Sequence, residues 1–259
     1  MIVADTSGAP RSIPSLTIDQ TAPLASAAWI FDLDDTLFAH REAVDDGILA
    51  TRTRLGGAIA AADAAAESAR WSALEEHHYH RYLAGELDFE GQRRERARGF
   101  LEPFGIALDG AEASTWFDAY FADYIAAWRL HDDALPMLER LAAIPGARLG
   151  LLTNGDPAFQ GRKLAAVGLG DRFEVVVASG AEGVVKPDPA IFRIACERLG
   201  VDPADAVYVG DRLRTDAIGA ASAGLAGVWI DRLGAATPDE LAAASAAGVR
   251  VINTLQELP

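Results

Sequence analysis

Cysteine is almost absent from this chain of 259 residues, in which Cys196 is the single example. One cysteine excludes an intrachain disulfide framework and any metal site built from several cysteines. It also favours a reducing, cytoplasmic location. Cys196 shares a helical face with Phe192 and Leu199, so we expect it to be buried and unreactive.

Positive charge is scarce as well. Lys and Arg number 23 against 38 Asp and Glu, which gives a formal net charge of −15, and the sequence pI is about 4.7. Nucleic acids and anionic membranes are bound by clustered positive charge, so this balance argues against both as partners. The chain also lacks a run of about 18 uncharged apolar residues that could cross a bilayer, and its first residues do not form a secretion signal. With half of its residues hydrophobic and 24% charged, we expect a soluble globular protein.

Two nucleotide-binding patterns are missing. The first apolar run is not followed by G-x-G-x-x-G, and G-x-x-x-x-G-K-[ST] occurs nowhere. These absences argue against a dinucleotide-binding fold and a P-loop NTPase.

Short apolar runs recur along most of the chain. They occupy residues 27–33, 147–154, 173–179, 206–211, 226–231 and 249–253. Runs that are apolar on both faces and alternate with helical patterns are typical of buried parallel strands. Asp156-Pro157 and Asp188-Pro189 are typical helix starts. The sequence therefore predicts an α/β fold with a doubly wound parallel sheet.

Between residues 42 and 129 the pattern changes to helical spacing without a strand-like run. Trp116, Tyr120, Tyr124 and Trp128 recur every four residues, which predicts the packed seam of a helical bundle. We expect an all-helical cap inserted after the first strand. The predicted organisation is a polar amino-terminal extension at 1–25, an α/β core at 26–41 and 130–259, and a helical cap at 42–129.

Polar residues follow several of the predicted strands, where an open parallel sheet binds its ligands. They are Asp32 and Asp34 after the first strand, Thr153 and Asn154 after the second, Asp211 and Asp216 after the fourth, and Lys186 ahead of a helix. Four carboxylates in one small volume repel one another unless a cation compensates them. Oxygen ligands favour a hard divalent ion, which we expect to be Mg²⁺. An acid can instead cap a helix, which is how we interpret Asp156 and Asp188 but not the whole set.

These residues carry a resemblance to a known family. The segments Asp32-Leu33-Asp34-Asp35-Thr36, Thr153-Asn154, Lys186 and Gly210-Asp211 with Asp216 occur in this order. The pattern resembles the haloacid dehalogenase superfamily, in particular its phosphatase-type members with a helical cap after the first strand. The resemblance covers about residues 27–255.

The resemblance implies a role for each matching residue. Asp32 would be the nucleophile that forms an aspartyl-phosphate, and Asp34 the general acid and base. Mg²⁺ would be held by Asp32, the backbone carbonyl of Asp34 and Asp211, with Asp216 in support. Thr153, the amide of Asn154 and Lys186 would bind the phosphoryl oxygens. The implied activity is Mg²⁺-dependent hydrolysis of a small phosphorylated metabolite, a phosphomonoester.

Several alternatives stay open at this point. The superfamily's dehalogenases lack an Asp two residues after the nucleophile, so Asp34 favours phosphate esters over haloacids. A phosphomutase or phosphotransferase, a 2-haloacid dehalogenase and a non-catalytic protein that binds a phosphate ligand are the competing hypotheses.

The cap is expected to choose the substrate. Its candidate contacts are Arg52, Arg54, His77, His78, His80 and Arg81. We expect the histidine cluster to lie on a solvated face, with substrate contact or metal binding as alternatives. The basic run at 91–99 predicts an exposed helix face, and Asp35 is interpreted as a turn residue that bonds nearby backbone.

Overall fold

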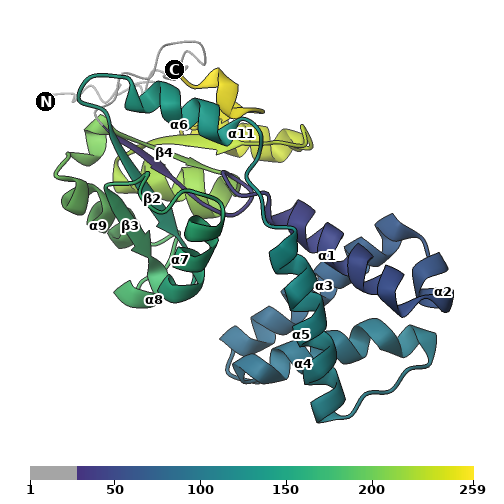
Figure 1. The fold of residues 1–259 in the computed structure, drawn as a ribbon. Coiled ribbons are helices and arrows are strands. Elements are labelled where there is room, and N and C mark those ends of the chain that lie inside the picture. The colour runs from purple at the N-terminus through teal and green to yellow at the C-terminus, as the bar shows by residue number, and fades with distance from the viewer. Residues whose placement is uncertain (1–27) are drawn as a thin grey trace, which may run out of the picture.

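The computed structural model describes residues 28–259, so the predicted extension at 1–25 lies outside the described residues. Figure 1 shows a sheet flanked by helices and a separate group of helices joined to it by a narrow connection. Among the described helices, none is long and apolar enough to cross a membrane.

The sheet has six parallel strands in the order β3-β2-β1-β4-β5-β6. They are β1 (Ala28–Phe31), β2 (Arg148–Thr153), β3 (Val175–Ala178), β4 (Ala206–Gly210), β5 (Ala226–Ile230) and β6 (Arg250–Ile252). The first strand in the sequence lies between β2 and β4, so the chain winds outward from it in both directions. The predicted doubly wound α/β fold is confirmed, and each predicted strand is found with slightly shorter bounds.

Helices cover both faces of this sheet. They are α6 (Ala134–Ala142), α7 (Pro157–Ala166), α8 (Ser179–Glu182), α9 (Pro189–Leu199), α10 (Gly219–Ala223) and α11 (Pro238–Ala246). Two short 3₁₀ helices, η2 (Pro203–Asp205) and η4 (Leu255–Glu257), and a π-helix, η3 (Leu213–Ile218), complete this part of the chain. Because side chains alternate along a strand, Trp29 and Phe31 pack in one hydrophobic cluster with residues of α6, whereas Ala28 and Ile30 pack in another with residues of α9 and α10. Cys196 lies in the second cluster and is buried, as predicted.

The second group of helices lies between β1 and β2 in the sequence. It consists of α1 (His40–Leu55), α2 (Gly57–Ala61), α3 (Ala64–Leu83), α4 (Phe89–Leu101), the turn η1 (Glu102–Phe104) and α5 (Gly110–Ala126). The ring of Trp71 lies 4.5 Å from that of Tyr120 and 5.6 Å from that of Trp116. Tyr120 in turn stacks on Tyr124 at 6.4 Å. The aromatic residues that recur every four positions therefore form the predicted packed seam.

The basic run at 91–99 is not the exposed face that its composition predicts. Arg96 is 6% exposed, and its guanidinium lies 4.7 Å from the ring centroid of Trp71 and 3.1 Å from a carboxylate oxygen of Glu75. Arg93 likewise lies over the ring of Phe89 at 4.2 Å. A flat guanidinium on an apolar stem can cover an aromatic surface, so a charged residue is no sure sign of exposure.

Two of the candidate cap contacts are also buried. Arg52 is 1% exposed and donates to the backbone carbonyls of Ile59 and Ala62, at 3.0 and 2.5 Å. It therefore supports the turn after α2 rather than facing a ligand. His78 is buried as well, contrary to the predicted solvated face, whereas His77 and His80 are exposed.

Two segments that run side by side connect the helices to the sheet. The amide of Ala39 donates to the carbonyl of Arg129 at 3.0 Å, and the amide of His131 donates to that of Leu37 at 2.9 Å. Phe38 and Leu130 form an antiparallel bridge between these bonds. This short ribbon places the helical group beside the carboxyl end of β1.

Candidate active site

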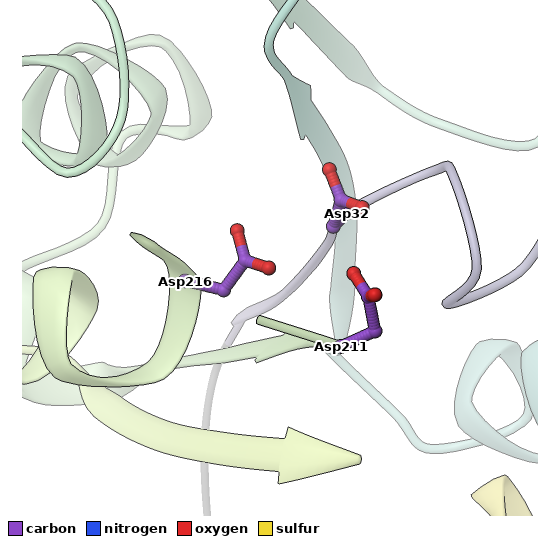
Figure 2. Close-up of side chains that lie close together, drawn as sticks. All are labelled: Asp32, Asp211 and Asp216. Atoms are coloured by element: carbon purple, nitrogen blue, oxygen red, sulfur yellow. The ribbon is translucent and has the colours of Figure 1, made fainter. Parts of the chain in front are cut away.

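Three carboxylates gather at the carboxyl end of the sheet. Asp32 follows β1, Asp211 follows β4 and Asp216 lies in η3. One potential ligand atom from each carboxylate lies within 4.8 Å of those of the other two, and Figure 2 shows the three side chains around a common space. The pairing of β1 with β4 brings these segments together, because the amide of Asp32 donates to the carbonyl of Val209 at 2.9 Å. A Cβ atom at Gly210 would lie 2.4 Å from Cβ of Asp216, so this approach requires glycine.

Lys186 is the cation of this cluster. Its Nζ donates to Oδ1 of Asp32 at 2.6 Å, Oδ1 of Asp216 at 2.7 Å and the hydroxyl of Tyr208 at 2.8 Å. Burial alone would lower the pKa of this 5% exposed lysine, but the charges of Asp32 and then Asp216 raise it above its ordinary value. Lys186 is therefore charged and holds two of the three acids.

One lysine does not neutralise three carboxylates. Burial raises the pKa of Asp32 to about 7, although Lys186 acts in the opposite direction. Burial, followed by the charges of Asp32 and Asp216, raises the pKa of Asp211 to about 8. Like charges held this close are relieved by a further cation, and an all-oxygen donor set suits a hard ion such as Mg²⁺. The residues present therefore fit the predicted metal.

The carboxylate of Asp216 is already engaged on both sides. Its Oδ1 accepts from Lys186, and its Oδ2 accepts from the backbone amide of Arg212 at 2.9 Å. Asp216 thus orients Lys186 and the loop after β4, which agrees with a supporting position in the cluster.

Thr153 and Asn154 lie next to this cluster at the end of β2. Thr153 is 1% exposed. The side chain of Asn154 bonds the backbone of Lys186 twice, since Oδ1 accepts from its amide at 2.9 Å and Nδ2 donates to its carbonyl at 3.2 Å. The side chain of Asn154 therefore positions the lysine loop, a function that the sequence pattern did not indicate.

The carboxylate of Asp34 does not join the other three acids, so the expected convergence of four carboxylates holds for three. Its Oδ1 accepts from Nζ of Lys163 at 2.6 Å, and its Oδ2 accepts from Nε2 of Gln160 at 3.3 Å. Burial would raise the pKa of Asp34, but Lys163 and then His40 hold it below its ordinary value. The sequence pattern did not single out Lys163 or Gln160. Their one available signal is their position three residues apart in the helix that follows Thr153-Asn154.

The turn after Asp34 has its own support. Asp35 has φ of 58°, and its Oδ1 accepts from the backbone amide of Arg41 at 2.8 Å, which confirms its interpretation as a turn residue. Arg232, after β5, donates to the carbonyls of Asp35 and Thr36 at 3.2 and 2.6 Å, and to both carboxylate oxygens of Asp133 at 3.0 Å. Arg232 thus ties this turn to the segment that returns from the helical group, and the sequence pattern did not single it out either.

Comparison with known proteins agrees with this geometry. A family model described as haloacid dehalogenase-like hydrolase matches residues 27–224. The glyceraldehyde 3-phosphate phosphatase of Methanopyrus kandleri is 34% identical over 206 residues, which cover 79% of this chain and 84% of that protein. The chain belongs to the haloacid dehalogenase-like hydrolase family.

Other members of the family match over shorter stretches or carry another chemistry. The phosphoserine phosphatase of Thermus thermophilus is 47% identical over 87 residues, and the match spans 34% of this chain and 35% of that relative. The solved 2-haloacid dehalogenase of Pseudomonas syringae pv. Tomato is 27% identical, with a TM-score of 0.56 over 89% of this chain and 95% of that one. The fold of the family is therefore shared by phosphatases and dehalogenases, and the site must distinguish them.

Proposed function

We propose that this protein is a Mg²⁺-dependent phosphatase that hydrolyses a small phosphomonoester through an aspartyl-phosphate on Asp32. The observation that carries the proposal is the position of Asp32, which is bonded to Lys186 and grouped with Asp211 at the carboxyl end of the sheet. The relatives named as phosphatases support the choice of substrate class.

The proposed reaction has two steps. A carboxylate oxygen of Asp32 attacks phosphorus, and the ester P–O bond breaks as the leaving oxygen takes a proton from the protonated form of Asp34. The protonated form is the minor one, because burial would raise the pKa of Asp34 but the charge of Lys163 holds it below its ordinary value. Water then attacks phosphorus of the aspartyl-phosphate and gives a proton to Asp34, which releases phosphate and restores Asp32. General acid–base help of this kind contributes about 10²–10⁴-fold to the rate.

The phosphoryl oxygens would be bound by Lys186, the hydroxyl of Thr153 and the amide of Asn154, because charge spreads over these oxygens in the transition state. Asp32, Asp211 and the backbone carbonyl of Asp34 would hold Mg²⁺, with Asp216 in support. The bound ion would supply positive charge against the substrate phosphate. This attraction must be local in a chain of net charge −15.

We further propose that residues 42–129 form the cap of a core made of 26–41 and 130–259, and that the cap selects the substrate. One contact and one electrostatic effect support this arrangement. Nδ1 of His40 lies 3.0 Å from the hydroxyl of Tyr124, and burial, followed by the charge of Asp34, raises the pKa of that tyrosine. Tyr124 of α5 thus lies within the electrostatic reach of the proposed acid.

A screen of phosphorylated metabolites for released inorganic phosphate tests the function. We expect steady release that requires Mg²⁺ and is abolished in Asp32→Asn. Return of the phosphoryl group to a bound sugar would instead identify a phosphomutase. Chloride release from 2-haloacids without added metal would identify a dehalogenase and contradict the proposal.

A further inference from the structure

We propose that Lys163 and Gln160 are positioning residues for Asp34: they hold its carboxylate so that Oδ2 is the oxygen presented to the leaving group. The inference rests on the proposed function, in which Asp34 protonates that group. It assigns a function to a second lysine, Lys163, which lies in a different part of the site from Lys186.

Helix α7 places both residues. It begins at Pro157, where the side chain of Asp156 accepts from the amide of Phe159 at 2.8 Å. Residues three apart lie on the same side of a helix, so Gln160 and Lys163 both face the end of β1. Lys163 is 2% exposed and Gln160 is 4% exposed.

The surroundings of Lys163 leave Asp34 as its partner. Among the ion pairs of residues 28–259, Lys163 is matched with Asp34 alone, at 2.6 Å. Its Nζ otherwise lies over the rings of Phe38 and Phe159, at 5.0 and 5.1 Å from their centroids. Aromatic faces attract a cation but impose little direction on it. The ammonium is therefore directed by Oδ1 of Asp34.

Such a pair is a poor way to stabilise a fold. The side chain of Lys163 is 3% exposed and that of Asp34 is 28% exposed. Taking the ammonium out of water costs about as much as its attraction to the carboxylate returns, so the pair adds little stability compared with apolar residues of the same size. Its value lies in fixing one geometry. Here the group held in one orientation is the carboxylate of Asp34, two residues after Asp32.

The two oxygens of Asp34 are held unequally. Oδ1 is bound by a short, charge-assisted bond from Lys163, whereas Oδ2 receives only a 3.3 Å contact from Nε2 of Gln160. That nitrogen is also 3.3 Å from Oγ1 of Thr153 and 3.4 Å from the carbonyl of Asn154. Oδ2 is thus the oxygen that can exchange its partner for the substrate. Gln160 sets its position relative to the phosphoryl-binding residues.

The test uses Lys163→Met, which keeps the apolar stem and removes the ammonium. We expect kcat/KM for an alkyl phosphomonoester, which reports the formation of the aspartyl-phosphate, to fall by about 10-fold or more, a part of the usual contribution of a general acid. For 4-nitrophenyl phosphate, whose leaving group departs without a proton, we expect a change of less than about 3-fold. The comparison uses kcat/KM because the second step, in which Asp34 takes a proton from water, is common to both substrates and would lower kcat for either. The exposed neighbour Arg162 supplies the matched control, since Arg162→Met should leave both rates unchanged.

A double-mutant cycle separates this inference from the proposed function. If Lys163 acts through Asp34, the variant Asp34→Asn/Lys163→Met should be no slower on the alkyl ester than Asp34→Asn alone. Equal losses of kcat/KM on both substrates in Asp34→Asn would overturn the acid function itself. If Asp34→Asn is selective but Lys163→Met slows both substrates equally, or the two losses multiply, the positioning inference alone fails.

Gln160→Leu provides a second variant in case the first does not fold, which a melting curve reveals. It removes the weaker contact and should reduce turnover of the alkyl ester several-fold, with 4-nitrophenyl phosphate again less affected. Faster turnover in either variant would mean that the pair restrains Asp34 away from the substrate, which contradicts the proposal.

Discussion

Two buried cations, one in the core and one in the helical group, show how differently the two regions use charge. Lys186 and Arg96 are 5% and 6% exposed. Lys186 is bonded to oxygens of Asp32 after β1, of Tyr208 within β4 and of Asp216 in η3, at 2.6 to 2.8 Å. Arg96 lies over the rings of Trp71 and Phe117, at 4.7 and 5.1 Å, and pairs with one carboxylate.

The difference lies in what each set of partners achieves. The aromatic rings around the guanidinium of Arg96 stabilise the packing of the helices. The guanidinium covers the apolar faces of the rings, and these faces attract its positive charge. Three clustered carboxylates, two of them bonded to one ammonium, exceed what packing needs, and like charges at short range oppose folding. We therefore attribute the buried charge in the core to the proposed chemistry, and the buried charge in the helical group to stability.

The largest effect should follow from removing the core cation. In Lys186→Met, we expect kcat/KM to fall by about 10²–10³-fold, as when one preorganised donor to a developing charge is lost. The free energy of unfolding should also fall, by about 3–5 kcal/mol, because Asp32 and Asp216 lose their partner. Steady-state kinetics with Mg²⁺ and denaturant titration measure the two. Unchanged kinetics in a folded variant would remove Lys186 from the site.

Arg96→Met is the matched change in the helical group. It keeps an apolar chain over Trp71 but removes the cation and leaves Glu75, which is partly exposed, without its partner. We expect a loss of about 1–2 kcal/mol of unfolding free energy and a kcat within about 3-fold of the parent. If activity fell as steeply as in Lys186→Met while the protein stayed folded, the conclusion that Arg96 serves stability and not catalysis would be wrong.

The effect of Mg²⁺ on the melting temperature should also differ between the two regions, and this difference should be smaller than the changes in activity. A ligand that binds only the native state raises the melting temperature. Addition of Mg²⁺ after treatment with a chelator should therefore raise the Tm of the parent and of Arg96→Met by a few degrees. The increase should disappear in Asp211→Asn, which removes a proposed ligand. An undiminished increase in Asp211→Asn would place the ion elsewhere.

In the core, the positions of the strand ends are predictable from the sequence, whereas the side-chain contacts between distant segments are not. Apart from Arg148 and Arg250, which begin β2 and β6, the strands are apolar runs. The polar residue that ends such a run emerges at the edge where the strands end. The apolar runs alone are therefore enough to place Asp32, Thr153 and Asp211 at this edge. The contact between Asp34 and Lys163 does not follow from such runs, because it joins residues 129 apart and depends on the rotation of α7 about its axis.

The helical group is predictable only in outline. The spacing of Tyr120 and Tyr124 correctly predicts a packed face, since helical periodicity records which side is buried. Charge composition does not record whether a long side chain lies flat on a ring. The burial of Arg96 over Trp71, and of Arg52 against backbone carbonyls, therefore emerges only from the three-dimensional packing.

The smallest effect should come from Arg54, an exposed candidate for substrate contact. Its Nη1 lies 2.7 Å from Oδ2 of Asp123, and its side chain is 49% exposed. A surface ion pair of this kind contributes about 0–1 kcal/mol, so Arg54→Ala should change the unfolding free energy by no more than that. KM for the substrate found by the screen should also stay the same, because Asp123 already holds the guanidinium. A raised KM at unchanged stability would show that Arg54 leaves Asp123 for the substrate, and charge in the helical group would then serve recognition as well as packing.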